Sequence, residues 1–428
     1  MILPDESRNG AAAADRPRLL YVSTLDHIVG VMLPHLDAAR ECGFAVEVAC
    51  RVTRLRDELL AHADAVHDLP FRRFPLHPAN LAALVRLVRL LRARPCRIVH
   101  AHNPTGGFVG RLAATIARVP VRVYTAHGFH FHPCGRRLAN AAYRAVERIA
   151  GHLLSDGVLV INRVDYDAAL RQRVVPKDKL FLTGGVGIST ETFDPAAVPE
   201  GTRRGIRREV GAADEAVPVL TVVGELIPRK RHADALDAFA LLRRTHPSAV
   251  LLLVGDGALL DDLRARAERL GIAGGCRFLG FRRDVAAVLA ATDVFLFPSL
   301  QEGLPCSVQE ALCMEVPVVA SDVRGNADLV DDGCGRLVPP GDPRALAEAA
   351  AELLALRPHE RRRMGAAGRA KMIRDFGRGA CVGQWLAVYD RLLARKGLPA
   401  ISSARFSAAR EGEASSGVEL VPRRRQPR

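Results

Sequence analysis

The sequence is poor in aromatic residues and has no long apolar run. Phe, Trp and Tyr make up 5% of its 428 residues, and Trp385 is the single tryptophan. No uninterrupted apolar stretch approaches the ~20 residues that a membrane-spanning helix needs, and residues 1–16 lack the apolar segment of a signal peptide. We therefore expect a cytoplasmic protein, or one bound peripherally to the inner face of the cytoplasmic membrane.

Cysteine patterns that would indicate a disulfide framework or a metal centre are also lacking. Nine cysteines are scattered along the chain, the count is odd, and no Cys-x-x-Cys occurs. This distribution is typical of small buried residues in a reducing compartment. No metal-binding Cys/His spacing occurs either, so we expect no metal and no other cofactor.

The charge balance is strongly basic. There are 61 lysines and arginines against 47 acids, which gives a formal charge of +14. Such a balance favours nucleic acid, an anionic membrane or phosphorylated substrates as partners. With few aromatics and no helix-turn-helix pattern, we expect no nucleic acid. Arginines 86, 89, 92 and 94 lie on one predicted helix, which is either a solvated face or a contact with anionic lipid.

Strand-like and helix-like segments alternate along the chain. In the first half we predict strands at 19–23, 45–49, 98–100, 121–125 and 158–161, and helices over 34–42, 81–93, 106–117 and 139–150. In the second half we predict strands at 218–223, 249–254, 277–279, 294–297 and 316–320, then helices at 343–355 and 358–375. Such alternation indicates an α/β protein with parallel, doubly wound sheets.

A stretch rich in proline, glycine and acids, Asp194–Gly201, interrupts this alternation. We therefore predict two tandem doubly wound, Rossmann-like domains with a linker between them. The predicted boundaries are 17–197 for the first domain, 198–215 for the linker, 216–378 for the second domain and 379–396 for a final helix. We expect residues 1–16 and the polar, basic tail 397–428 to be disordered.

Two glutamates eight positions apart, Glu302 and Glu310, are the first candidates for chemistry. They lie between the predicted strands 294–297 and 316–320, one in a loop and one on the predicted helix 307–313. Ligands of open α/β sheets bind at this edge, where a helix N-terminus binds phosphate and carboxylates bind diols. A nucleotide sugar fits that combination. Alternatively, Ser307 and Glu310 form a capping box, which these four positions alone would favour.

The wider sequence resembles the donor site of the family-four glycosyltransferases. The resemblance is carried by Glu302-Gly-Leu-Pro…Glu310-Ala-Leu…Pro317-Val-Val-Ala-Ser-Asp322-Val-Arg-Gly-Asn326. In the first half, Asp26-His27, Val99-His-Ala-His102-Asn-Pro104 and Tyr124-Thr-Ala-His127-Gly-Phe-His-Phe131 are similar to the branch that builds bacterial exopolysaccharide and capsule repeat units. The resemblance covers about residues 18 to 395.

This resemblance implies a GT-B architecture, in which an interdomain cleft holds a nucleotide sugar. It implies sugar transfer from a UDP-linked donor to a saccharide or polyprenyl-diphosphate-linked acceptor, with retained anomeric configuration and no metal. Two other interpretations stay open. One is a nucleotide-sugar 2-epimerase of the same architecture, and the other is a non-catalytic sugar-binding partner in a polysaccharide assembly complex.

The resemblance also assigns roles to residues. His127 and Glu302 are expected to be catalytic, near the donor sugar, and Glu310 is expected to bind the ribose diol. The expected donor-binding residues are Gly224, Arg229, Lys230, Gly303, Leu304, Pro305, Ser307 and Glu310. On the acceptor side the candidates are His27, His102 and Asn162.

Two positions depart from the family pattern, and one motif is similar to that of another glycosyltransferase fold. Glu225 stands where most relatives have the arginine that contacts the diphosphate, so Arg229 or Arg231 is expected to supply that charge. Glu315 stands where relatives usually have glycine, which favours a left-handed turn after a helix. Asp165-Tyr-Asp167 is similar to a metal-binding motif of another glycosyltransferase fold, but begins a predicted helix and is expected to be structural.

Overall fold

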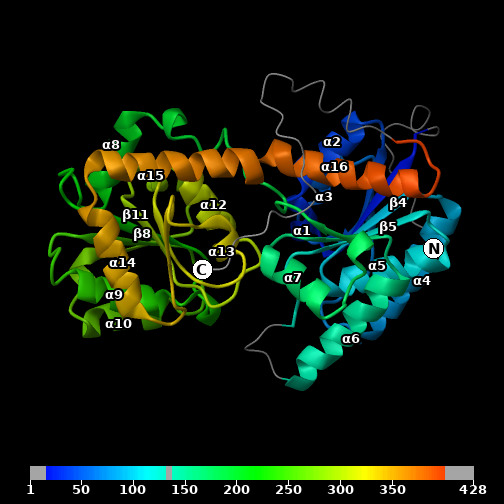
Figure 1. The fold of residues 1–428 in the computed structure, drawn as a ribbon, viewed down its shortest axis with the longest axis horizontal. Coiled ribbons are helices and arrows are strands. Elements are labelled where there is room, and N and C mark those ends of the chain that lie inside the picture. Colours follow the sequence, from blue (N-terminus) through cyan, green and yellow to red (C-terminus); the bar gives the residue numbers. More distant parts are fainter. Residues whose placement is uncertain (1–15, 132–136, 401–428) are drawn as a thin grey trace. The chain divides into compact units, whose positions relative to one another are not determined.

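The computed structural model describes residues 16–131 and 137–400, which belong to two compact units (Figure 1). The second unit is Ile188–Gly377, and the first combines the chain before it with the chain after it. The N-terminal unit is therefore discontinuous in sequence. The expected disorder of 1–16 and 397–428 concerns segments that lie almost entirely outside the described residues.

The N-terminal unit is built on one parallel sheet with the strand order β3-β2-β1-β4-β5-β6-β7. Its strands are β1 (Arg18–Leu25), β2 (Ala45–Arg51), β3 (Ala65–Asp68), β4 (Ile98–His102), β5 (Val121–Ala126), β6 (Gly157–Val160) and β7 (Leu180–Leu182). Its α-helices are α1 (Asp26–Gly30), α2 (Leu33–Glu41), α3 (Arg56–His62), α4 (Pro78–Ala93), α5 (Pro104–Ile116), α6 (Arg137–Leu153), α7 (Arg163–Arg171) and α16 (Arg378–Arg395).

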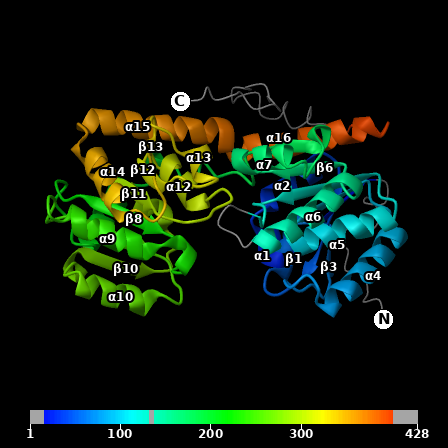
Figure 2. The ribbon, with the colours of Figure 1, turned by 60° about the horizontal axis from the view of Figure 1, so that its bottom comes forward.

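Strand β1 shows how the two faces of this sheet are filled. Alternate side chains of a strand point to opposite faces. Leu19 and Tyr21 enter the core that contains α2, α3 and α16, whereas Leu20 and Val22 enter the core under α4 and α5. The helices accordingly form two layers, with α2 and α16 on one face and α4, α5 and α6 on the other (Figures 1 and 2). Strands buried on both faces explain the continuous apolar runs in the sequence.

Helix α16 completes the core of the N-terminal unit. Trp385, Tyr389 and Leu392 are buried together with residues of β1, β2 and α2. The Tyr389 hydroxyl lies 2.5 Å from Nδ1 of His100 and 3.2 Å from the Tyr21 hydroxyl. The sequence predicted this amphipathic helix, but not the core to which it belongs.

The C-terminal unit is built on a second parallel sheet, with the strand order β10-β9-β8-β11-β12-β13. Its strands are β8 (Val219–Val223), β9 (Val250–Val254), β10 (Cys276–Gly280), β11 (Val294–Phe297), β12 (Val318–Ser321) and β13 (Gly335–Val338). Its α-helices are α8 (Glu200–Glu209), α9 (His232–Leu242), α10 (Leu260–Arg269), α11 (Val285–Ala290), α12 (Cys306–Cys313), α13 (Asn326–Leu329), α14 (Pro343–Ala355) and α15 (Pro358–Lys371).

The predicted linker 198–215 is wrong, because this segment contains α8 and belongs to the C-terminal unit. Ile206 and Val210 are buried against residues of β8, β9 and α11. Arg207 is buried as well, and its guanidinium donates to the carbonyls of Ala291 and Val217. A helix with so few apolar residues beside a Pro/Gly-rich stretch has the composition of a linker. The boundary between the units instead lies at residues 187/188.

Both sheets reverse their strand order at one point, between β1 and β4 and between β8 and β11. Ligands of doubly wound sheets bind at the carboxyl ends of the strands at such a switch point. In the C-terminal unit, the loops after β8 and β11 carry Gly224–Lys230 and Pro298–Pro305. In the N-terminal unit, the segments after β1 and β4 begin at Asp26 and Asn103.

Candidate functional site

The loop after β11 places Glu302 among positive charges. Its Oε1 accepts hydrogen bonds from Ser299 Oγ at 2.5 Å and from Arg229 Nη1 at 2.6 Å, and Lys230 Nζ lies 2.9 Å from the same oxygen. The Glu302 side chain is buried. One carboxylate thus faces two cations, and Arg324 Nε donates to the Glu302 carbonyl at 3.0 Å. The cluster has a net positive charge and is suited to an anion.

The turn that carries Arg229 and Lys230 is held by contacts with β11 and the loop that follows it. The Arg229 carbonyl accepts from the Leu300 backbone N–H at 3.0 Å, and Ser299 Oγ lies 3.2 Å from the same carbonyl oxygen. The Lys230 ammonium lies over the Phe297 ring, 4.7 Å from its centroid. Because β8 and β11 are neighbours in the sheet, these contacts hold the predicted diphosphate residues in a fixed position beside Glu302.

Two glycines that are not among the predicted site residues make this arrangement possible. Gly255 has a φ of +137°, and a Cβ there would lie 2.1 Å from the Gly224 carbonyl oxygen. A Cβ on Gly257 would lie 2.5 Å from the Leu226 carbonyl oxygen. Any side chain at these positions would displace the segment that leads to Lys230. The sequence signal for them is a Gly-x-Gly directly after the predicted strand 249–254.

Helix α12 begins at Cys306 with Pro305 as its N-cap, and no side chain caps it. Ser307 and Glu310 therefore do not form a capping box, and the alternative interpretation of these residues is wrong. The partly buried Glu310 carboxylate has no hydrogen bond or ion pair with any side chain in the part of the chain that the structure describes. Burial raises the pKa of Glu310 from its ordinary 4.5 to about 7. Such a carboxylate is available to a ligand.

The loop from Gly303 to Pro305, which leads into α12, is closed by the loop after β12. Gly325 has a φ of +82°, and a Cβ there would lie 2.3 Å from the Gly303 carbonyl oxygen. Together with the Arg324 bond to the Glu302 carbonyl, this contact fixes the approach to α12. The predicted donor residues Gly303, Leu304, Pro305 and Ser307 are thus adjacent to Glu302 and Glu310 along one ordered segment.

The structure distinguishes between the two arginines proposed to compensate for Glu225. Arg231 adopts a left-handed conformation, with φ at 54°, and pairs with Asp234 at 2.7 Å. Arg229 instead joins the cluster around Glu302. Arg229 is therefore the arginine that the fold brings to the candidate site.

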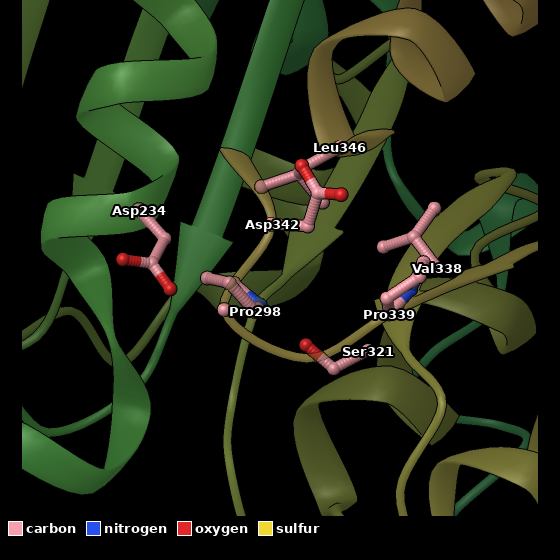
Figure 3. A pocket seen from close by; sticks show the side chains of 8 residues that line it. Asp234, Pro298, Ser321, Val338, Pro339, Asp342 and Leu346 are labelled. Atoms are coloured by element: carbon pink, nitrogen blue, oxygen red, sulfur yellow. The ribbon is translucent and has the colours of Figure 1, made fainter. Parts of the chain in front are cut away.

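A small recess lies at the same edge of the C-terminal sheet. Its lining comes from α9, from the ends of β11, β12 and β13, and from the start of α14 (Figure 3). Among the described residues no lysine or arginine lines it. Of its two acids, Asp234 pairs with Arg231 and Asp342 caps α14. The recess therefore does not suit a diphosphate.

In the N-terminal unit, the predicted catalytic residue His127 follows β5. Its Nε2 lies 3.3 Å from Nδ1 of His102, and burial lowers the pKa of His127 to about 4. The imidazole is therefore neutral at physiological pH and can donate or accept one hydrogen bond. Gly128, which follows it, has a φ of +132°, a conformation that favours glycine.

Two of the three candidates for the acceptor side are fully buried. The ring of His102 stacks on the rings of Tyr21 and Trp385, at centroid distances of 5.7 Å. Asn162 caps α7, because its Oδ1 accepts from the Asp165 backbone N–H at 2.8 Å. Direct contact of His102 or Asn162 with an acceptor is therefore not supported. Only charge and polarity were visible in the sequence, and burial was not.

His27 is exposed, and its neighbour Asp26 organises the segment around it. Asp26 Oδ2 accepts from the backbone N–H groups of Thr53, Arg54 and Leu55. Although burial would raise the pKa of Asp26, these hydrogen bonds hold it well below its ordinary value. Asp165 is structural as expected, since its Oδ2 accepts from the backbone N–H of Phe129 at 3.2 Å.

Within residues 16–131 and 137–400, no group of three or more His, Cys, Asp and Glu side chains could hold a metal ion. Independence from metal and from other cofactors is not tested by this and stays a prediction.

Two Rossmann-like units in one chain, with candidate residues near the carboxyl ends of the strands of each sheet, define the class of GT-B proteins. Comparison with solved structures supports this class. HepE of Anabaena in complex with UDP matches with a TM-score of 0.74 at 20% identity, covering 88% of this chain and all (100%) of that one. The predicted α/β fold class is confirmed, and the cleft between the domains stays a prediction.

Sequence comparisons identify the family. Residues 35–184 match the model of the glycosyl transferase 4-like domain, and residues 204–371 match that of the glycosyl transferases group 1. A Bacillus subtilis (strain 168) protein named “Putative glycosyltransferase EpsD” is 32% identical over 379 residues, covering 87% of this chain and 96% of that protein. The chain therefore belongs to the family-four GT-B glycosyltransferases and is a glycosyltransferase.

A second relative is the UDP-Gal:α-D-GlcNAc-diphosphoundecaprenol α-1,3-galactosyltransferase of Escherichia coli. It is 29% identical over 254 residues, covering 59% of this chain and 64% of that enzyme.

Proposed function

We propose that this glycosyltransferase transfers a sugar from UDP to a saccharide or polyprenyl-diphosphate-linked acceptor in the assembly of cell-envelope exopolysaccharide. The observation that carries the proposal is the cation cluster of Arg229 and Lys230 around Glu302, next to the Glu310 carboxylate, which has no partner among the side chains that the structure describes. The names of EpsD and of the Escherichia coli galactosyltransferase support a transferase over the epimerase and over a non-catalytic binding protein.

In this proposal each donor contact has a physical reason. Glu310 accepts hydrogen bonds from the ribose diol, and a carboxylate is a strong acceptor there. The diphosphate lies against Arg229, Lys230 and the N-terminus of α12, which stabilise the charge that develops on the leaving group. Oε1 of Glu302 already bonds the cations, which leaves Oε2 for a hydroxyl of the donor sugar.

In the N-terminal unit the proposed catalytic residue is His127, near the donor sugar. Its neutral imidazole can form one hydrogen bond to a sugar hydroxyl near the reaction centre. We further propose that the anomeric configuration is retained and that the cations replace a metal ion. These statements follow the family resemblance.

Product analysis tests the reaction. The enzyme is incubated with a panel of nucleotide sugars, with and without a membrane extract that contains lipid-linked acceptors. We expect that one UDP-sugar is consumed and that a glycosylated lipid appears, and that both happen only when the extract is present. Isomerised donor without acceptor would establish the epimerase, and unchanged donor in every reaction would establish the binding protein.

We also propose that the enzyme works at the anionic inner face of the cytoplasmic membrane, where a polyprenyl-linked acceptor is located. Arg86, Arg89 and Arg92 of α4 are exposed. None of the described helices is both long enough and apolar enough to cross a bilayer. Changing the three arginines to glutamate should weaken binding to anionic vesicles, and most strongly at low salt, because exposed charges are screened over about 10 Å at 0.1 M. Unchanged binding would reject α4 as a contact.

A further inference from the structure

Helix α6 presents its apolar side chains to the outside of the N-terminal unit. Leu138, Ile149 and Leu153 are 87%, 54% and 68% exposed, whereas Ala150 and Gly151 are its buried residues. The exposed apolar residues recur at helical spacing and form one strip, the α6 stripe: Leu138, Ala142, Ala145, Val146, Ile149 and Leu153. In an ordinary surface helix such a strip faces the core.

The inner side of α6 is held by polar contacts instead. Glu147 pairs with the buried Arg111 at 3.3 Å and accepts a hydrogen bond from the Tyr124 hydroxyl at 3.3 Å. A Cβ on Gly151 would lie 2.8 Å from the Val174 carbonyl oxygen, so the helix is closely packed at that point. The orientation of α6 is therefore fixed by specific contacts, and the exposure of the stripe follows from it.

One flank of the α6 stripe is basic. Arg137, Arg144 and Arg148 recur at helical spacing beside it, and the one acid of the helix, Glu147, is turned inward. Arg144 and Arg148 each also donate one hydrogen bond to Gln172. The outward surface of α6 is thus apolar in the middle, has guanidinium groups along one edge and carries no acid of the helix. A surface with these properties complements an anionic membrane, in which acyl chains lie beneath negatively charged headgroups.

We propose that the α6 stripe docks on the surface of an anionic membrane, with its apolar side chains among the headgroups and its arginines against phosphates. Helix α6 belongs to the same layer as α4 (Figures 1 and 2). The inference rests on the proposed membrane location, but not on the proposed transfer reaction. It assigns the apolar contact to α6, whereas α4 offers mainly charge.

Vesicle sedimentation tests the proposal. The full chain is mixed with vesicles of phosphatidylglycerol and phosphatidylcholine, or of phosphatidylcholine alone. The triple change Leu138→Ser, Ile149→Ser and Leu153→Ser should lower binding to the anionic vesicles by at least about tenfold, since each side chain loses apolar contact. The matched control, Leu81→Ser with Val85→Ser, removes two exposed apolar residues of α4 and should bind as wild type.

Two further measurements complete the test. All five changed residues are exposed, so both variants should retain the melting temperature and the UDP affinity of wild type. The wild-type chain has one tryptophan, Trp385, which is buried. Ile149→Trp places a second tryptophan on the stripe, and the fluorescence emission of this variant should shift to the blue when anionic vesicles are added. An unshifted emission would overturn the proposal.

The possible outcomes distinguish the α6 contact from the membrane location and from the transfer reaction. Loss of binding in the α4 control alone would move the contact to α4 and leave the membrane location intact. Wild type that binds no vesicles but still binds UDP would end both membrane proposals without touching the transfer reaction. A wild-type dimer that the α6 variant dissociates would show instead that a second copy of the chain covers the stripe.

Discussion

Changing Glu310 to glutamine should stabilise the protein and, at the same time, weaken its binding of UDP. Glu310 is partly buried on α12 and has no bonding partner among the described side chains, and burial raises the pKa of this residue to about 7. Burying an ionised carboxylate in that position lowers the free energy of unfolding, because the charge loses its contact with water. Glutamine has the same shape and carries no charge, so the variant avoids that cost.

The expected magnitude follows from the pKa. A rise from 4.5 to about 7 corresponds to about 3 kcal/mol, on the scale of 1.4 kcal/mol per pH unit. Because the pKa is higher in the folded state, the stability due to the protonated carboxyl is full below about pH 4.5 and is lost as the pH rises through about 7. Glu310→Gln and wild type should therefore be equally stable near pH 4.5, whereas the variant should be more stable at pH 8.

The assay is chemical denaturation of both proteins at several pH values between 4.5 and 8. Glu315→Gln is the matched control, because Glu315 is an exposed glutamate just after the same helix. Because its side chain is exposed, this change relieves no burial of charge, and the free energy of unfolding should stay close to that of wild type. UDP affinity, measured by calorimetry at pH 8, should fall about 10- to 100-fold in Glu310→Gln, which is the scale of a hydrogen bond to a charged group.

The pH dependence of binding gives the sharpest comparison. Wild-type affinity relative to Glu310→Gln should rise from pH 5 and level off above about pH 7, as the carboxylate becomes ionised. The titration of UDP itself is common to both proteins and cancels in this ratio. A variant that is less stable at every pH and binds UDP normally would refute the reasoning and return Glu310 to a purely structural role.

Three other outcomes can be measured directly. Glu315→Gly should raise the free energy of unfolding by about 1 kcal/mol, because Glu315 has a φ of 59° and glycine adopts that conformation without strain; no gain would show that the turn is not strained. His127→Ala and Glu302→Ala should each lower transfer on the order of 10²-fold or more while UDP affinity changes little, and near-normal transfer would exclude a catalytic role for that residue. Activity should survive EDTA, and loss that magnesium or manganese restores would contradict this.

Much of the fold could be predicted because most strands are buried on both faces and read as continuous apolar runs. β9 and β11 were predicted to within one residue. The strands that were not predicted, β3, β7 and β13, have at most four residues and are only partly buried, whereas the four-residue strand β11 is buried throughout. Helix α8 was not predicted because Arg207 is buried in the structure, whereas an arginine in a sequence is normally expected to be exposed.

The site was predictable where the chain itself brings residues together, as in the segment from Glu302 to Glu310. It was not predictable where burial decides the role. His102 and Asn162 carry polar groups at strand ends, and only the packed structure shows that both are enclosed. The capping box was likewise undecidable from four residues, because Ser307 could serve as a cap only if the helix began two residues later than it does.

The place of α16 in the core of the N-terminal unit has a consequence for how the chain is made. This unit needs Trp385, Tyr389 and Leu393 to complete its core, and they follow Gly187 by about 200 residues. At about 5 to 20 residues per second, a ribosome takes roughly 10 to 40 s to supply them. During that interval the face of the first sheet that α16 will cover is open, while the whole second unit is synthesised. The half of the protein that emerges first is therefore the half that can finish folding last.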